Sequence, residues 1–233
     1  MYDGASRRAE GPDAALCAGF LELPISGASI SVFPGLTPES MVCATDTVAA
    51  RIDELQFDLG EGPRWEALRN RRAVLLPEVR TASHTGWPVF AKALMDLEVS
   101  ALFVFPLVIG AMDIGVVELY SSKPGPLSPA DHSAALQLAD AAAWMLLRQI
   151  LAPAPGGGTH AQQEGSPLSR REVHQATGMV LAQTGTSARD ALLLLRAHAF
   201  AQGRTVRDVA RDVVSRSLDF TPPVGGSASA PVE

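Results

Sequence analysis

The side chains that most often carry enzyme chemistry are few in this sequence, and their spacing fits no common catalytic or metal-binding motif. The five histidines stand at positions 84, 132, 160, 174 and 198. The sequence contains no His-Glu-x-x-His motif, no Cys/His spacing suited to a metal and no Gly-x-Ser-x-Gly nucleophile elbow. We therefore predict that the protein is not an enzyme and holds no metal ion, and we interpret His174 and His198 as packed or exposed helix residues.

Cys17 and Cys43 are the only cysteines among the 233 residues. They are too few and too widely separated to suggest a disulfide framework or a zinc site, which favours a reducing compartment. The N-terminus shows no signal peptide, because acids and proline follow Arg8 where an apolar run is required. The longest apolar stretch, 99–112, is interrupted by polar and turn residues and falls short of the ~18 residues that a spanning helix needs. We expect a cytoplasmic protein that does not enter a membrane.

Two groups of acidic and glycine residues invite a chemical interpretation. The adjacent acids Asp53 and Glu54 lie in a predicted helix over 47–56, on the side away from its apolar residues. We interpret them as a solvated face rather than as an acid/base pair. The turn Leu-Gly-Glu-Gly-Pro at 59–63 precedes a helix with Pro63 at its first position. Such a turn can hold an anion, but its spacing fits no common phosphate-binding motif and Glu61 would repel a phosphate.

Charge is distributed unevenly along the chain. The net charge is −6, but residues 1–168 carry 11 basic and 19 acidic side chains, whereas residues 169–220 carry 8 arginines and 5 acids. A basic C-terminal segment after an acidic body fits a polyanionic partner for the smaller part only. A solvated, arginine-rich helical surface explains the same charges without any partner.

Three helix starts, eighteen residues apart, organise the C-terminal segment 169–218. They read Ser169-x-x-Glu172, Ser187-x-x-Asp190 and Thr205-x-x-Asp208. In each, the hydroxyl can accept from a free backbone N–H of the first turn while the acid complements the helix dipole. Each helix has an apolar stripe: Val173, Ala176, Val180 and Leu181; Ala191, Leu192, Leu195 and Ala199; Val206, Val209, Ala210 and Val213. Because no single helix could bury its stripe alone, a compact three-helix unit is predicted.

The longer N-terminal segment, 13–151, mixes strands and helices. Helices are predicted at 13–22, 47–56, 63–70 and 89–97, and strands at 29–33, 41–45 and 73–76. The β-rich runs 100–108 and 115–120 predict a hairpin at the centre of an antiparallel sheet. Ser128 and Pro129 start a long helix to about Leu151. Its alanine-rich stripe fits either a dimer interface or burial against its own sheet.

Three segments are predicted to lack a fold of their own. Residues 1–12 are polar, and residues 221–233 are rich in proline, glycine and serine, which is typical of a disordered tail. Residues 152–167 contain a glycine triplet and several prolines, which exclude a continuous helix and predict a flexible linker between two domains.

The segment 168–220 resembles the ANTAR domain, the small RNA-binding output module of bacterial transcription antiterminators. The resemblance rests on Gln175-Ala-Thr-Gly-Met-Val-Leu181, on Gly185-x-Ser187, on Ala191-x-x-x-Leu195-Arg196-x-x-Ala199 and on Val206-x-x-Val209-Ala210. It implies binding to hairpin RNA. Many members carry a basic residue where this chain has Thr177.

The RNA-binding residues expected from this resemblance are the arginines at the start of the third helix and residues of the first. Arg204, Arg207 and Arg211 are the phosphate-contact candidates, followed by Arg170 and Arg171. Gln175 and Gly178 belong to the motif itself. Glycine inside a helix costs about 1 kcal/mol relative to alanine, so Gly178 suggests close approach by RNA or by a neighbouring helix.

Residues 13–151 resemble a GAF domain, a small-molecule sensor module with a central antiparallel sheet flanked by helices. The resemblance rests on the motifs 55–63, Phe103-x-Phe-Pro-Leu107, Gly115-Val-Val-Glu-Leu-Tyr120 and Gly125-Pro-Leu-Ser-x-x-Asp131. Related sequences often place Cys where this chain has Arg64. The resemblance implies an α+β fold and a pocket for a small molecule of unknown identity. Four aromatic residues are the candidates for its lining, and a role in the hydrophobic core alone is the alternative for each: Trp65, Trp87, Phe103 and Phe105.

Together the two resemblances imply a GAF–ANTAR transcription antitermination regulator of the actinobacterial type. Its partners would be hairpin RNA, a small-molecule signal and a second copy of the chain. Two alternatives stay open: a DNA-binding helix-turn-helix regulator, and a dimerisation scaffold that binds no nucleic acid. Against the first, the third helix carries Asp208 and Asp212 among its arginines.

Overall fold

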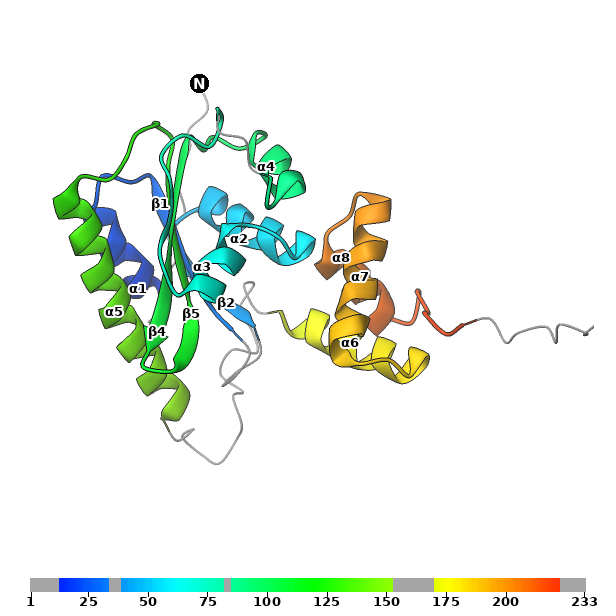
Figure 1. Ribbon diagram of the computed structural model, residues 1–233. Coiled ribbons are helices and arrows are strands. Elements are labelled where there is room, and N and C mark those ends of the chain that lie inside the picture. The colour runs from blue at the N-terminus through cyan, green and yellow to red at the C-terminus, as the bar shows by residue number, and fades with distance from the viewer. Residues whose placement is uncertain (1–12, 34–38, 82–84, 153–169, 223–233) are drawn as a thin grey trace, which may run out of the picture. The chain divides into compact units, whose positions relative to one another are not determined.

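The computed structural model describes residues 13–33, 39–81, 85–152 and 170–222, and Figure 1 traces the other segments in grey. The chain divides into two compact units, Met1–Ser169 and Arg170–Glu233. The predicted disordered N-terminus, most of the predicted tail and nearly all of the predicted linker lie outside the described residues.

A five-stranded antiparallel sheet forms the centre of the first unit, in the order β2-β1-β5-β4-β3. The strands are β1 (Gly27–Val32), β2 (Ser40–Ala44), β3 (Val74–Leu76), β4 (Ala101–Ile109) and β5 (Met112–Ser121). The predicted hairpin is β4–β5, and β5 is the middle strand. Gly115 is required where β5 pairs with β1, because a Cβ there would lie 2.1 Å from the Ser31 carbonyl oxygen.

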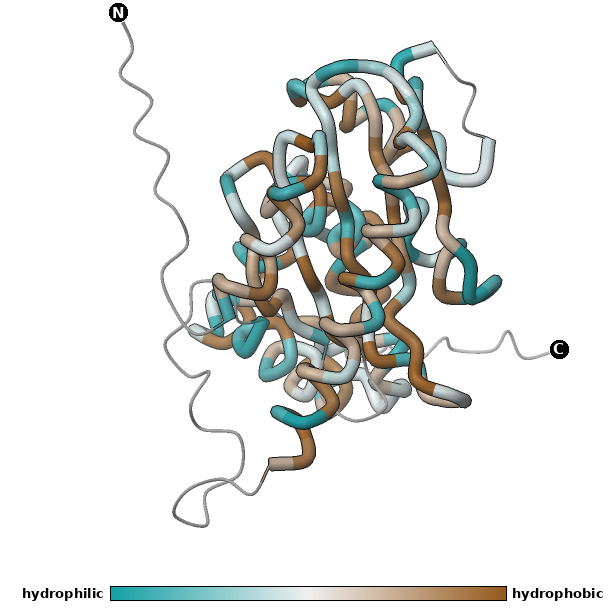
Figure 2. Tube along the Cα trace, turned by 90° about the vertical axis from the view of Figure 1, so that its left-hand side faces the viewer, coloured by the Kyte–Doolittle hydropathy of each residue, from teal (hydrophilic) through white to brown (hydrophobic). Residues whose placement is uncertain are grey.

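Helices cover both faces of this sheet (Figure 1). One face packs against α1 (Ala14–Ala18), the 3₁₀ turn η1 (Gly19–Glu22) and α5 (Pro129–Leu151). The other packs against α2 (Thr47–Leu59), α3 (Pro63–Asn70) and α4 (Pro88–Leu94). Two hydrophobic cores result, and Figure 2 shows the hydrophobic stretches of the chain in brown. The predicted α+β fold class is confirmed.

The long helix α5 buries one side and exposes apolar residues on the other. Ser128 caps it by accepting from the Asp131 N–H at 3.1 Å. Its buried residues are mostly alanines, which let the helix lie close to the sheet. Large apolar side chains remain exposed: Leu136, Trp144, Met145 and Leu151. Burial against its own sheet therefore explains the alanine stripe but not these four residues.

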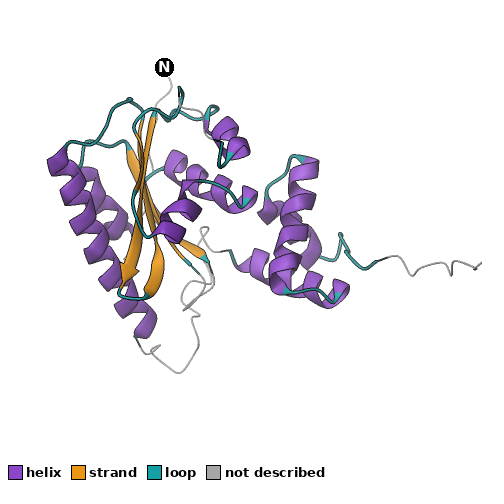
Figure 3. Cartoon of the chain, in the orientation of Figure 1, coloured by secondary structure: helices purple, strands orange, loops and turns teal. Residues whose placement is uncertain are grey.

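The second unit is a three-helix bundle of α6 (Arg171–Thr184), α7 (Ala188–Gln202) and α8 (Val206–Val214), seen in Figure 3. Ser187 and Thr205 cap α7 and α8 by accepting from the N–H groups of Asp190 and Asp208, at 3.2 and 3.1 Å. The predicted cap Ser169 lies outside the described residues. All three predicted stripes enter the core, except that Leu181 is exposed and Leu192 only half-buried.

One prediction about the cysteines is wrong, because Cys17 and Cys43 form a disulfide. The bond joins α1 to the edge strand β2, and both side chains are buried. The two cysteines are 26 residues apart in sequence, but α1 packs beside β1 and β2, which brings their Cα atoms to 6.0 Å. The cysteines therefore give no support to the expected reducing compartment. Among the described residues no helix is both long and apolar enough to cross a membrane.

We expect the disulfide to stabilise the first unit by about 3.5 kcal/mol, the loop-closure value for a sequence separation of 26 residues. Chemical denaturation of the Cys17→Ala/Cys43→Ala variant measures this free energy. As a control for substitution in the same helix turn, Ala18→Ser is added to the variant that already lacks both cysteines. Equal unfolding free energies for wild-type protein with and without a reductant would contradict the expectation.

Candidate functional site

The interior of the first unit contains a buried ion cluster centred on Arg64. Pro63 starts α3, and Arg64 follows it with a side chain that is 0% exposed. Its Nε donates to Glu118 Oε1 at 3.2 Å, and Nη2 donates to Glu118 Oε2 at 2.8 Å. Nη2 also donates to Asp53 Oδ1, and Nη1 lies 3.6 Å from Glu39 Oε1. One cation thus ties together α2, α3, β5 and the residue before β2.

Neutral polar side chains complete the cluster. Gln56 donates from Nε2 to Glu118 Oε1 and accepts from the Arg64 backbone N–H at 3.0 Å. Ser31 donates its hydroxyl proton to Asp53 Oδ1. Gly62 is needed at the turn, because its φ is +138° and a Cβ would lie 2.4 Å from Gln56 Oε1. The Gly-Pro turn therefore delivers Arg64 into the interior.

The electrostatics of the cluster keep Arg64 charged. Burial alone would lower the pKa of Arg64, but the carboxylates of Asp53 and Glu118 outweigh that effect and raise the pKa above its usual range. A guanidinium whose pKa is raised has no proton to exchange near neutral pH. The arrangement is therefore suited to holding elements together rather than to acid/base chemistry.

One interpretation of this region is corrected. Asp53 is not on a solvated face, since its side chain is 0% exposed and bonded to Arg64. Only its neighbour Glu54 is partly exposed, paired with Arg51 at 2.8 Å. Glu61 has a structural partner too, because its Oε1 accepts from the Phe90 backbone N–H at 2.7 Å and so caps the start of α4.

The four aromatic residues predicted to line a ligand pocket lie on opposite faces of the sheet. Phe103 and Phe105 are buried in the core under α5. Trp87 and the half-buried Trp65 belong to the core under α2–α4. Trp65 meets Phe33 edge to face at 5.4 Å, and Trp87 meets Phe90 at 5.7 Å. The structure therefore does not bring these four side chains into one pocket.

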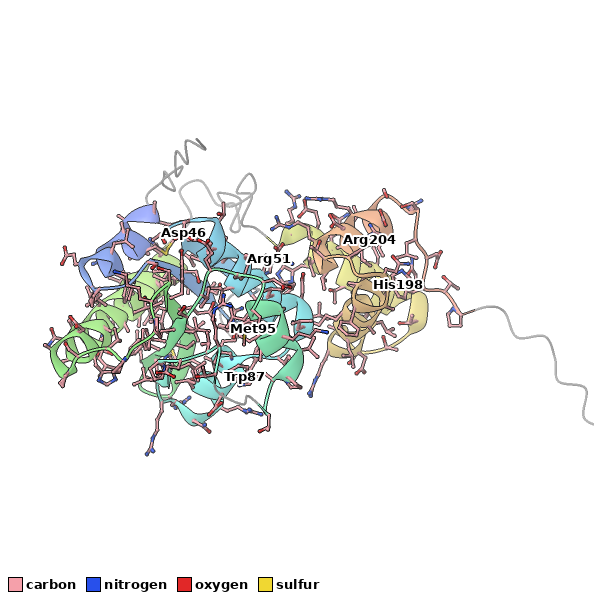
Figure 4. All side chains as sticks on the ribbon, turned by 90° about the horizontal axis from the view of Figure 1, so that it is seen from above. Asp46, Arg51, Trp87, Met95, His198 and Arg204 are labelled. Carbon is pink, nitrogen blue, oxygen red and sulfur yellow. A yellow bond between two sulfur atoms is a disulfide. The ribbon has the colours of Figure 1, made fainter. Side chains whose placement is uncertain are left out.

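An open groove runs along the edge strand β3. It consists of two adjoining hollows of about 410 and 440 Å³, which share Glu66, Ala73 and Val74. The larger hollow reaches Thr85 and Trp87, and Trp87 is labelled in Figure 4. Of the four predicted aromatic residues, Trp87 alone lines this larger hollow. Its mixture of a carboxylate, a hydroxyl and an indole can take a small polar ligand.

In the second unit, two of the predicted phosphate contacts form ion pairs with neighbouring aspartates. Arg204 Nη1 lies 2.7 Å from Asp212 Oδ2, and Arg211 Nη1 lies 3.1 Å from Asp208 Oδ1. All four side chains are partly exposed, so water screens these pairs and a phosphate can replace the aspartate at small cost. Arg204 is labelled in Figure 4. Arg207 is half-buried and lies one turn before Arg211 on α8.

The predicted residues of α6 divide into a buried and an exposed group. Arg170, the residue before the helix, is buried and makes its contacts inside the protein. Arg171, Gln175 and Gly178 are exposed and follow one another at intervals of four and three residues, so they share one face. A Cβ on Gly178 would meet no atom within 4 Å. Within the described residues, no neighbouring helix accounts for this glycine.

The Arg64 cluster predicts a large loss of stability when the cation is removed. We expect Arg64→Ala to lower the unfolding free energy by about 3–5 kcal/mol, because buried carboxylates lose their partner. Arg51→Ala, which breaks only the exposed pair with Glu54, should cost at most about 1 kcal/mol.

Both variants are measured by urea denaturation. Millimolar methylguanidinium should restore part of the melting temperature of Arg64→Ala and leave Arg51→Ala unchanged, because the free cation can enter the vacated site. Equal stability of the two variants would show that the cluster does not stabilise the fold.

The comparisons with known protein families divide the chain into the same two units as the structure does. The model of the GAF domain family matches residues 14–146, and that of the ANTAR domain matches residues 162–214. Among solved structures, a GAF domain/HD domain protein from Geobacter sulfurreducens is 18% identical, with 61% of this chain and 98% of that chain covered and a TM-score of 0.47. The cyanobacteriochrome TePixJ GAF domain is 20% identical, with 64% and 98% covered and a TM-score of 0.46.

A search of curated protein sequences finds no match. The two family models carry the assignment, because the first spans more than half of the 233 residues and the second follows it along the chain. The chain therefore belongs to the GAF domain family and, with its C-terminal ANTAR domain, is a two-domain GAF–ANTAR regulator.

Proposed function

We propose that this protein is a signal-responsive transcription antitermination regulator, in which the three-helix unit binds hairpin RNA of nascent transcripts and the GAF domain controls that binding. The observation that carries the proposal is the ANTAR match over α6–α8. The signal is a small polar molecule, and the groove beside β3 is its proposed site. No catalytic step is part of this function.

The charges of the second unit support a polyanionic partner. Residues 169–220 carry 8 arginines and 5 acids, and Arg171, Arg204 and Arg211 are exposed. Exposed arginines bind phosphates through charge-assisted hydrogen bonds, and release of counterions from the nucleic acid contributes to affinity. Gln175 and Gly178 add a hydrogen-bonding amide and an open backbone surface beside Arg171.

Hairpin RNA fits this unit better than duplex DNA does. Acidic residues on a groove-reading helix are repelled by the DNA phosphates that border both sides of the major groove. On α8, Asp208 and Asp212 stand beside Arg211 and Arg204 and pair with them. RNA hairpins are recognised through shape, loop bases and phosphates. A short row of arginines at one edge of the three-helix unit is therefore sufficient to contact the phosphates of a hairpin.

The GAF domain is proposed to pair two copies of the chain through α5. Leu136, Asp140, Trp144 and Leu151 share one exposed side of this helix at heptad-like spacing. Trp144 is 58% exposed although it is the largest apolar side chain of the helix. A second copy of α5 would remove these side chains from water, which contributes roughly 25 cal/mol per Å² of apolar surface.

The RNA proposal predicts a change in both affinity and salt dependence. We expect Arg207→Ala/Arg211→Ala to weaken binding to an RNA with two short hairpins and to reduce the log–log salt slope by about 1.5, because two phosphate contacts are lost. Arg51→Ala/Arg148→Ala makes the same change of net charge in the other unit and should leave both quantities unchanged.

Fluorescence anisotropy across a salt series measures both quantities, with matched duplex DNA beside the RNA. Equal affinity for the duplex would favour a helix-turn-helix regulator. No binding to RNA at about 50 mM salt, where phosphate contacts are weakly screened, would contradict the proposal.

The dimer proposal predicts that Trp144→Glu lowers the molar mass measured by light scattering from that of a dimer to that of a monomer, because the charge would be buried at the centre of the interface. Val89→Glu places the same change on an exposed residue of α4, on the opposite face of the sheet, and should leave the mass unchanged. A monomeric wild-type protein at micromolar concentration would contradict it.

A further inference from the structure

Along one side of helix α7, arginines alternate with large apolar side chains in a stripe. Arg189, Leu193, Arg196 and Phe200 are spaced by four, three and four residues and therefore follow one side of the helix. Of these four residues Arg196 alone is half-buried and has a partner within the protein. Leu193 is 60% exposed and Phe200 is 65% exposed. The opposite side of α7 carries the buried Ala191, Leu195 and Ala199, so the bundle already has its core without the stripe. No role in folding explains an exposed phenylalanine here.

The charges of this stripe distinguish it from the exposed stripe of α5. On α5 the residue between the large apolar side chains is Asp140, whereas on α7 each apolar residue has an arginine one turn before it. Arg189 is exposed and forms no ion pair with any residue that the structure describes. A symmetric pairing of two α7 helices would bring these arginines together across the two-fold axis, which is unfavourable. Binding to a polyanion would instead neutralise the arginine charge on this side of α7.

We propose that Phe200 is a stacking platform for an unpaired loop base of the hairpin RNA, with Leu193 beside it and the exposed Arg189 on a flanking phosphate. Unpaired bases in RNA loops are commonly recognised by stacking on aromatic side chains. Phe200 offers a free ring face for this, and Arg204 follows it after the Gly203 turn. The inference rests on the proposed RNA binding and adds to it the residue that reads the loop rather than the stem.

Substitutions at Phe200 should change affinity without changing the fold or the salt dependence. We expect Phe200→Ala to weaken hairpin binding roughly ten- to hundredfold, the range for losing one stacked base. Phe200→Trp should retain affinity, and Phe200→Leu should lose it although its apolar area is largely kept. The salt slope should stay at the wild-type value in all three variants, since no phosphate contact is removed. Leu194→Ala, on the same helix but away from the stripe, is the matched control.

The loop base itself supplies a second readout. The full-length protein is titrated against hairpins in which each loop position in turn is 2-aminopurine, whose fluorescence falls on stacking. Wild-type protein should quench one position strongly, and Phe200→Ala should not quench it at saturating concentration. This signal reports stacking and is insensitive to a general loss of affinity.

The possible results separate the two proposals. If wild-type protein binds the hairpin and Phe200→Ala binds equally well, the stacking role is wrong while the RNA-binding function stands. If wild-type protein does not bind hairpin RNA under any salt condition, both are wrong. If Phe200→Ala instead lowers the molar mass of the RNA-free protein, the stripe is a protein interface and the stacking role is again overturned.

Discussion

The buried guanidinium of Arg64 holds together the layers from which the first unit is built. It bonds to Glu118 on the central strand and to Asp53 on α2 from its own position at the start of α3. Removing these charges from water is costly, and the cost is offset only when each charge keeps its partners. The cluster therefore links α2, α3 and the central strand through directional bonds that each need their partner in place. Gly62 and Pro63 serve that geometry, because they fix the turn from which Arg64 enters.

This occupied interior has a consequence for how the domain can receive a signal. Between β5 and helices α2 and α3, the space is filled by the protein's own cation and its carboxylates. A ligand there would have to displace a salt-bridged guanidinium, whereas the groove beside β3 is open to solvent. Glu66 connects the two regions, since it lines the groove two residues after Arg64 on the same helix. Binding in the groove can thus act on α3 without entering the core.

Local sequence patterns predicted the helices and strands well, but they did not predict the contacts between elements that are distant in sequence. Caps such as Ser128, Ser187 and Thr205 depend only on residues within one turn, and their predicted bonds are present. The burial of Asp53 depends on Arg64 and Glu118, which lie 11 and 65 residues away. One signal was available, because Glu118 interrupts an apolar run on a strand predicted to be central and so required a buried partner. The Cys17–Cys43 disulfide offered no such local signal, since it depends on how α1 packs against β2.

The two exposed helical stripes suggest a physical reason for combining these domains in one chain. The stripe on α5 carries large apolar side chains around a central tryptophan, with Asp140 as its one charged residue, which suits a second copy. The stripe on α7 alternates with arginines, which suits a polyanion. If α5 pairs two chains, each dimer presents two RNA-binding units joined through their GAF domains. Binding of one hairpin then raises the effective concentration of the second unit near a neighbouring hairpin, and avidity increases without any new contact. A signal that changes only the pairing of α5 would in this way control RNA binding, and no direct contact between the groove and α7 is required.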